Sequence, residues 1–221
     1  MRVFRKIMAY SLILLIPVAM LCLSANILLR APDVVQFSLK ATEALDKANI
    51  YAEEDIVGDT ISDFMLHKSS ELQLNMSETE TDFYFLFSKT DQDAASRLRL
   101  ITDVSAIAGA VFILATVLIY FYLIRNEFTE ILRWLFKREC IILLLFLGIS
   151  VAAFNVTAVS DFIYAHIFPF KFSEGDAIPM ILDRYYARML LTVGCIVSGI
   201  FMTITGYITW KLTKPKRMFF W

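Results

Sequence analysis

The chain has 221 residues, 58% of them hydrophobic, and a net charge of −1 at pH 7. Its mean hydropathy of +0.62 excludes an ordinary soluble domain and favours a membrane protein. All three cysteines lie in or beside apolar stretches, which excludes a disulfide framework and gives no zinc-site pattern. Without an excess of basic residues, we expect no role in nucleic-acid binding.

Four apolar runs predict four membrane-spanning helices. They cover residues 7–29, 104–124, 140–160 and 189–210, and none contains a lysine, arginine, aspartate or glutamate. Each reaches the ~20 residues that a helix needs to cross a ~30 Å hydrocarbon core. The first run is longer than the ~7–15 apolar residues of a signal peptide, so we expect a retained anchor.

Charges are sorted by sign between these runs. The N-terminal tip, the segment 125–139 and the C-terminal tail hold eleven basic and three acidic residues, whereas residues 30–103 and 161–188 hold ten basic and nineteen acidic ones. Cytoplasmic segments carry the excess of lysine and arginine. We therefore predict an α-helical membrane protein with one membrane domain over residues 1–221. Both termini would be cytoplasmic, and residues 30–103 and 161–188 extracellular.

The longer outer segment predicts a small extracellular cap that mixes helix and strand. Apolar and polar residues alternate over 35–41 and again over 72–76, which favours strands. Residues 55–66 place their apolar side chains on one helical face. We also expect a helix over 92–103 that leads directly into the second span.

Few polar groups lie inside the spans. Gly194 and Ser198 are four residues apart, so they share a helix face that another helix could approach closely. Asn155 is expected to bond a neighbouring helix rather than a ligand. The lack of charged residues within the runs argues against an ion or proton pathway through the bilayer centre.

The shorter outer segment is rich in phenylalanine, tyrosine and proline around His166. Such a loop would lie along the outer membrane surface, because aromatic side chains favour that interface. An imidazole there can titrate near neutral pH and move protons. The alternative is an interfacial histidine satisfied by water or backbone, and composition alone leaves both interpretations open.

Three elements carry a resemblance to a known family. They are Ala165-His166-Ile-Phe168-Pro-Phe170, then Asp176-Ala-Ile178-Pro-Met-Ile-Leu182-Asp-Arg-Tyr185-Tyr186, and the helix Asp55-Ile-Val-Gly-Asp59-Thr-Ile-Ser-Asp-Phe64-Met-Leu66. With the order of anchor, outer segment, two-span hairpin, aromatic loop and final span, they resemble four-span membrane proteins of Gram-positive bacteria. That family includes the lipoprotein intramolecular transacylase (Lit).

The resemblance implies an acyltransferase of the bacterial cell membrane with its active face extracellular. Such an enzyme moves an acyl chain from the diacylglyceryl group of a lipoprotein's N-terminal cysteine to the α-amino group, giving the lyso-form. It implies diacylglyceryl-modified lipoproteins and membrane lipid as partners, without a cofactor or metal. We expect His166 as general base, with His67 and Tyr164 as further catalytic candidates. The expected substrate-binding residues are Asp103, Arg99, Asp176, Arg184, Tyr185, Tyr186 and Arg188.

One position departs from the family pattern. The family places a second histidine just before the second span, whereas this chain has Leu100 there, followed by Asp103-Val104. Either His67, at the end of the outer helix, takes its place, or activity is impaired. The alternative to an enzyme is a non-catalytic scaffold or accessory protein that binds a partner through its acidic outer cap.

Overall fold

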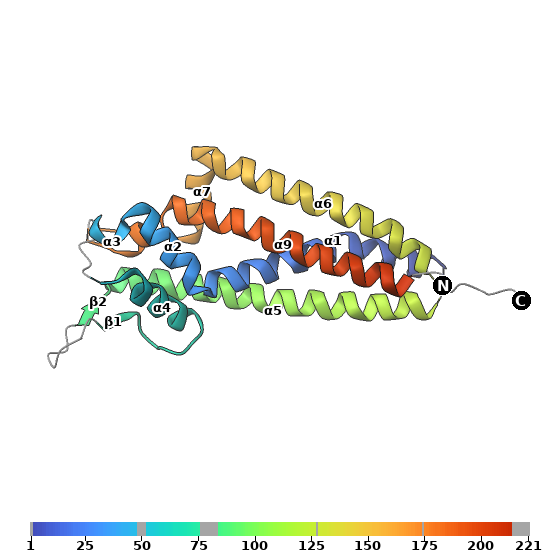
Figure 1. Ribbon diagram of the computed structural model, residues 1–221, viewed down its shortest axis with the longest axis horizontal. Coiled ribbons are helices and arrows are strands. Elements are labelled where there is room, and N and C mark those ends of the chain that lie inside the picture. Colours follow the sequence, from blue (N-terminus) through green and yellow to red (C-terminus); the bar gives the residue numbers. More distant parts are fainter. Residues whose placement is uncertain (1, 48–51, 76–83, 127, 174, 214–221) are drawn as a thin grey trace, which may run out of the picture. The chain divides into compact units, whose positions relative to one another are not determined.

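The structure is a computed structural model that describes residues 2–47, 52–75, 84–126, 128–173 and 175–213. In this part of the chain nearly every element is a helix (Figure 1). The helices are α1 (Arg2–Arg30), α2 (Pro32–Thr42), α3 (Ala44–Lys47), α4 (Glu54–Met65), α5 (Lys89–Arg125), α6 (Thr129–Asn155), α7 (Thr157–Ile167), α8 (Ile178–Ile181) and α9 (Arg184–Thr213). The strands are β1 (Gln73–Asn75) and β2 (Tyr84–Leu86), which pair antiparallel.

The chain divides into two compact units. Unit 1 contains Met1–Ser24, Ala106–Ile149 and Cys195–Trp221, and unit 2 contains Ala25–Ser105 and Ser150–Gly194. The long helices α1, α5, α6 and α9 each contribute residues to both units. All the short helices and the β-hairpin belong to unit 2.

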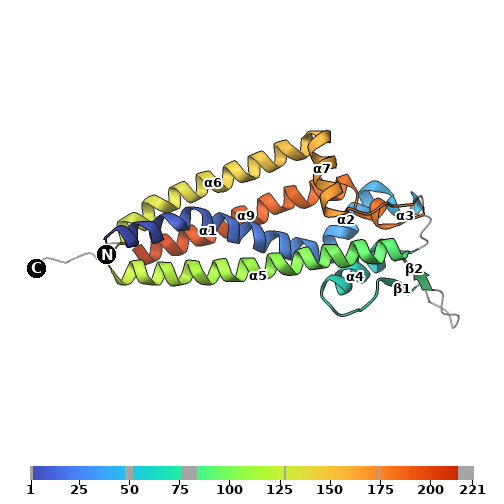
Figure 2. The ribbon, with the colours of Figure 1, turned by 180° about the vertical axis from the view of Figure 1, so that it is seen from behind.

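Three helices of the described chain are long and apolar enough to cross a membrane. They are Lys6–Arg30 in α1, the whole of α5 and the whole of α9. The third predicted span corresponds to α6 and α7 taken together, and these two helices are bent by 98° where they meet (Figure 2). The described residues thus give three spans, or four where the bent pair counts as one.

Small residues allow close helix packing in unit 1. The hydroxyl oxygens of Ser24 in α1 and Ser198 in α9 lie 2.8 Å apart, and both side chains are buried. A Cβ at Gly206 of α9 would lie 2.6 Å from the ring of Phe136 in α6, so glycine leaves room for this ring in its present position. The close packing expected at Ser198 is confirmed.

Asn155 does not bond a neighbouring helix, so that prediction is wrong. Its Nδ2 donates to the carbonyl oxygen of Val151 in the same helix, at 2.8 Å, and the side chain is exposed. The reason is that α6 ends at Asn155. At a helix end, an asparagine side chain readily bonds its own backbone.

The strand predicted over residues 35–41 is also wrong, since α2 occupies this segment. Pro32 stands at the first helical position, where its fixed φ favours a helix start. Val35 and Leu39 are buried, four residues apart, whereas Phe37 is 60% exposed. The burial therefore follows a helical period, and the alternation in the sequence is coincidental.

The other elements expected in this segment are confirmed. Helix α4 buries Val57, Ile61, Phe64 and Met65 on one face. Strand β1 covers part of the second alternation, whose last residue, at position 76, lies outside the described residues. Helix α5 runs without a break from Lys89 through the second predicted span. The core of unit 2 packs these elements against the segment that contains α8.

Glu139 of α6 is a carboxyl group buried in unit 1. It is fully buried, and neither of its side-chain oxygens has a hydrogen-bond partner among the described residues. It immediately precedes the third predicted span, so the apolar runs did not reveal it. A buried polar group without a partner is destabilising, and burying it as a charge would cost still more.

We predict that Glu139→Met raises the free energy of unfolding by about 1–3 kcal/mol, because it removes an unsatisfied buried group at nearly constant volume. Thermal unfolding of the purified protein in detergent measures this. The control is Glu130→Met on the same helix, where an exposed side chain should change stability by less than about 0.5 kcal/mol. A Glu139→Met variant less stable than the native protein would contradict the prediction.

Candidate functional site

A histidine, an aspartate and an arginine form a connected group in unit 2. His67 Nε2 lies 2.8 Å from Asp103 Oδ2, and Arg30 Nη2 donates to Asp103 Oδ1 at 2.6 Å. Arg30 is the last residue of α1, His67 follows α4 and Asp103 lies in α5. Both carboxylate oxygens are thereby used, and the carboxylate fixes the orientation of the imidazole.

The backbone of His67 has a left-handed conformation, with φ of 61°. For a residue other than glycine this costs about 1–2 kcal/mol. The backbone N–H of His67 bonds the carbonyl oxygen of Phe64 at 3.2 Å, which closes the last turn of α4. The turn directs the imidazole to Asp103, and it leaves the side chain about half exposed.

Arg99 fixes the end of α4 from one turn before Asp103. Its guanidinium carbon lies 4.2 Å from the centre of the Phe64 ring, and Nη1 donates to the Phe64 carbonyl at 3.4 Å. Because Phe64 is buried, its contacts with Arg99 hold the C-terminal end of α4, and His67 projects from the turn that follows this end. Arg99, expected to bind substrate, is here engaged by the protein itself.

His166 lies near the end of α7 with its side chain exposed. Its Nδ1 is 2.8 Å from the carbonyl oxygen of Phe162, and the two rings are 4.1 Å apart between centres. A carbonyl can only accept, so Nδ1 carries a proton, and in the neutral imidazole Nε2 then has a free lone pair. We find no hydrogen bond to Nε2 within the described residues.

The two histidines approach α5 from different sides. Arg97 donates to the carbonyl oxygens of Ile167, at 2.9 Å, and of His166, at 3.3 Å, whereas Asp103 holds His67. At about 100° per residue, Arg97 and Asp103 leave α5 about 120° apart, with Leu100 halfway between them. Leu100 is 63% exposed. His67 and His166 make no direct contact in the described structure.

Buried aspartates tie the start of α5 to the loop that holds α8. Asp91 accepts hydrogen bonds from the backbone N–H groups of Ala177 and Ile178, at 3.0 and 2.9 Å. Asp176 accepts from the Ser88 hydroxyl and from the Ser173 backbone N–H, both at 2.6 Å. These bonds, the hydroxyl first, lower the pKa of the Asp176 carboxyl. Asp176 therefore orders the loop.

An open cleft of about 620 Å³ lies in unit 2 where α7 and the start of α9 meet the aromatic loop. Its walls combine aromatic rings with two carboxylates and an arginine. The lining residues are Asp161, Tyr164, Ala165, Phe168, Phe170, Phe172, Pro179, Asp183 and Arg184. A cavity of this size and composition suits a largely apolar ligand that carries a polar group. His166, one residue beyond Ala165, is outside this lining.

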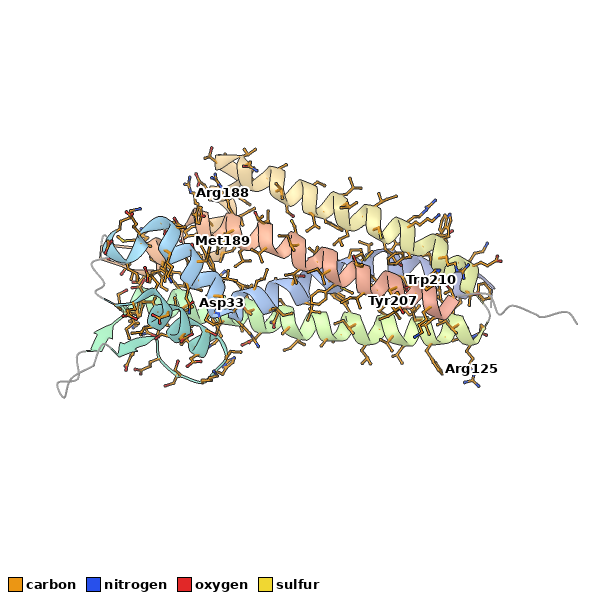
Figure 3. The ribbon with its side chains drawn as sticks, in the orientation of Figure 1. Asp33, Arg125, Arg188, Met189, Tyr207 and Trp210 are labelled. Atoms are coloured by element: carbon orange, nitrogen blue, oxygen red, sulfur yellow. The ribbon has the colours of Figure 1, made fainter. Side chains whose placement is uncertain are left out.

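Of the expected tyrosines and arginines, only Tyr164 and Arg184 belong to the lining of this cleft. The Tyr164 hydroxyl donates to the Leu182 carbonyl at 3.1 Å, and Tyr186 is buried. Tyr185 is 42% exposed. Arg184 forms an ion pair with Asp161 across the cleft wall. Arg188 lines a small hollow beside Tyr164 and projects from the first turns of α9 (Figure 3).

Several structurally important residues escaped the sequence analysis. Arg30 is only one of the bases of the outer segment, and the sequence-based prediction included neither Asp91 nor Ser88. Asp161 of the cleft belongs to the acidic excess, and Asp183 lies in the second resembling element, but neither was predicted to have a role. Asp91 follows Ser88 by three residues at the start of a helix, which is the spacing of a helix N-terminal cap. From the sequence, that spacing could have predicted the hydrogen bond between Ser88 and Asp91.

Solved structures show what this fold is similar to. Over 97% of this chain and 96% of the other, it matches the membrane integral lipoprotein intramolecular transacylase Lit from Bacillus cereus, in a variant with a histidine-to-alanine substitution. The TM-score is 0.73 at 15% sequence identity. A second structure of Lit from Bacillus cereus matches over 96% and 98% of the two chains, with a TM-score of 0.69 at 13% identity. No protein-family model and no curated protein sequence matches the chain. The chain is thus a divergent membrane protein with a Lit-like fold.

We predict that Asp176→Asn makes stability less sensitive to acid. A carboxyl whose pKa is lowered by folding stabilises the protein above its unfolded pKa, near 4, and this contribution is lost as pH falls through the folded pKa. At pH 6 the variant should have a lower free energy of unfolding than the native protein. On acidification its free energy of unfolding should fall by less. Thermal unfolding at several values between about pH 6 and pH 2 tests this.

The control is Asp93→Asn, which changes an exposed aspartate near the start of α5. The stability of this variant should change with pH in the same way as that of the native protein. Parallel loss of stability in Asp176→Asn and the native protein would contradict the assigned role of Asp176.

Proposed function

We propose that this protein is an intramolecular transacylase that acts on lipoproteins whose N-terminal cysteine carries a diacylglyceryl group. It would move one acyl chain from the glyceryl ester to the α-amino group of the same cysteine. The likeness in fold to Lit, over nearly the whole of both chains, supports this proposal. The arrangement of the two histidines in unit 2 supports it independently.

The observation that carries the proposal is that each imidazole is anchored through one nitrogen. His166 is held through Nδ1 by a backbone carbonyl, and His67 through Nε2 by Asp103. Each ring therefore has a defined orientation and a second nitrogen that can accept a proton. Oriented imidazoles are the usual general bases of acyl transfer near neutral pH.

The proposed reaction requires proton transfer and stabilisation of an oxyanion. The α-ammonium group, whose pKa is ordinarily about 7.7–8.0, loses one proton to water to give the free amine, and a histidine takes a second proton from the nitrogen as the amine attacks. The nitrogen attacks the ester carbonyl, and the carbon–oxygen bond to glycerol then breaks. The proton passes to the glyceryl oxygen, giving an amide and a free hydroxyl. Amine and ester belong to one molecule, so much of the entropic cost of bringing them together is already met.

The surface around Leu100 offers a place for the reacting groups. Leu100 lies on α5 between the side that holds His67 and the side that contacts the backbone of His166. Because Leu100 is exposed, the proposed substrate would lie over it, between the side of α5 that holds His67 and the side that contacts the His166 backbone. The open aromatic cleft would accept an acyl chain, with Arg184 and Arg188 orienting the polar group. To donate to the oxyanion, the Tyr164 hydroxyl would exchange its bond to the Leu182 carbonyl for one to the substrate.

The sorted charge supports an extracellular active face. All of the candidate residues lie in unit 2, which contains the acidic segments of the sequence, whereas both chain ends belong to unit 1. With the basic termini in the cytoplasm, unit 2 would face outward. There it would meet lipoproteins at the outer leaflet of the bacterial cell membrane.

We predict that His166→Ala and His67→Ala each lower formation of the lyso-form by about 10²–10⁴-fold, as expected for loss of a general base. Mass spectrometry of a reporter lipoprotein, in a strain lacking other transacylase activity, measures transfer of the acyl chain to nitrogen. Lys68→Gln, which changes an exposed neighbour of His67, should remain active. If the native protein leaves acylation unchanged and co-purifies with a stoichiometric partner, it is a scaffold instead.

Asp103→Asn tests whether the orientation of His67 matters. An amide has one oxygen and one nitrogen in place of the two carboxylate oxygens, so it cannot accept hydrogen bonds from both Arg30 and His67. The imidazole then loses the bond that fixes its tautomer. We expect the transfer rate to fall by about 10²–10⁴-fold while the protein still folds. Asp63→Asn, which removes an exposed pair with Lys68, is the matched control. Equal rates in the two variants would exclude His67 as an oriented base.

A further inference from the structure

Unit 1 contains an apolar groove that the proposed reaction does not use. It has a volume of about 540 Å³ and is walled by residues of α1, α5 and α9. On α5 its lining extends from Ile113 to Ile124, and on α9 from Thr205 to Leu212. At 1.5 Å per residue the α5 wall is about 16 Å long. This is about half of a ~30 Å hydrocarbon core, the length of one leaflet.

The groove wall offers almost no polar contact to a ligand. It contains no charged side chain, and its only polar groups are the hydroxyls of Thr116, Tyr120, Thr205 and Thr209. The last three are already engaged: Tyr120 pairs with Thr209, and both threonines of α9 bond carbonyls of their own helix. Only the Thr116 hydroxyl is buried without a partner among the described residues. Such a wall suits an alkyl chain and excludes a polar substrate.

Two basic side chains stand at one end of the groove. Ile124 of the lining is followed by Arg125, the last residue of α5, and Leu212 of the lining is preceded by Lys211 in the last turn of α9. Both cations are exposed, and neither forms an ion pair within the described part of the chain. Figure 3 shows Arg125 projecting from the end of its helix.

Aromatic side chains mark the same end of α9 as an interface. Tyr207 and Trp210 are 59% and 54% exposed, with ring centres 6.2 Å apart. Exposed tyrosine and tryptophan next to cationic residues are typical of the headgroup level of a membrane. The groove therefore begins at that level and extends one leaflet deep into the apolar region.

We infer that this groove binds one acyl chain of an anionic phospholipid, whose phosphate is held by Arg125 and Lys211. The length of the groove fits a chain that spans one leaflet. The unpaired cations at its mouth favour a headgroup with net negative charge over a zwitterionic one. This site is independent of the histidines and the aromatic cleft of unit 2.

The test is native mass spectrometry of the full-length, delipidated protein titrated with phosphatidylglycerol or with phosphatidylcholine of the same chains. Val117→Trp would fill the groove from an exposed lining position. Its control is Val111→Trp, because Val111 lies on the same helix, is also 57% exposed and does not line the groove. We expect phosphatidylglycerol binding to fall by about tenfold or more in Val117→Trp and to stay unchanged in Val111→Trp. Equal binding by the two variants would overturn the inference.

A second set of variants tests the headgroup contact without touching the helix packing. Arg125→Gln and Lys211→Gln should each weaken phosphatidylglycerol binding by about fivefold and leave phosphatidylcholine binding unchanged. Lys137→Gln, an exposed lysine of α6 away from the groove lining, should change neither. If the double variant still prefers phosphatidylglycerol, the phosphate is bound elsewhere and the assignment is wrong.

Discussion

Four charged side chains on the first turns of α5 hold the segments of unit 2 around one helix. Asp91 binds the loop before α8, Arg97 the end of α7, Arg99 the end of α4, and Asp103 both Arg30 and His67. Three of these four contacts reach backbone groups at the ends of other helices, where carbonyls or N–H groups lack partners within their own helix. Charge-assisted bonds to such groups are about twice as strong as neutral ones.

This arrangement makes the continuity of α5 essential to the site. Because a helix is stiff, the four side chains keep fixed angles and heights relative to one another. Each of the segments that carry His67, His166 and the aromatic loop therefore has its own attachment to a common axis. A break in α5 between Asp91 and Asp103 would separate the histidines from the loop, whatever the hydrophobic packing of the rest of unit 2.

The sequence predicted the features that depend on local periodicity. The apolar runs located the long helices, and the apolar face of residues 55–66 located α4. The prediction failed where tertiary contacts decide the secondary structure, as at α2. The alternating pattern of this segment carries no information about which of its sides meets the core. It also could not foresee the buried Glu139, because burial of a residue next to a span depends on how the other helices pack.

The candidate site was predictable in its residue types and unpredictable in its pairings. His67, His166 and Asp103 were all singled out, but the pair of His67 with Asp103 joins positions 36 residues apart and depends on the left-handed turn at His67. Arg30 completes the group from the end of a third helix, and nothing local marks it.

The position of Leu100 connects the resemblance with the geometry. By the family pattern a histidine would stand there, on the stripe of α5 that lies halfway between the sides serving His67 and His166. In the proposed reaction, the imidazole of His67, which Asp103 and Arg30 orient on one flank of that stripe, would take the role of this side chain. In the proposed reaction, the exposed Leu100 would add apolar surface beneath the reacting groups, which would favour an acyl ester over a water-exposed polar substrate. A base can be moved to a neighbouring element in this way provided that its ring is held as firmly as before. In the proposed role, the Asp103 carboxylate shared between Arg30 and His67 would hold the imidazole in this way.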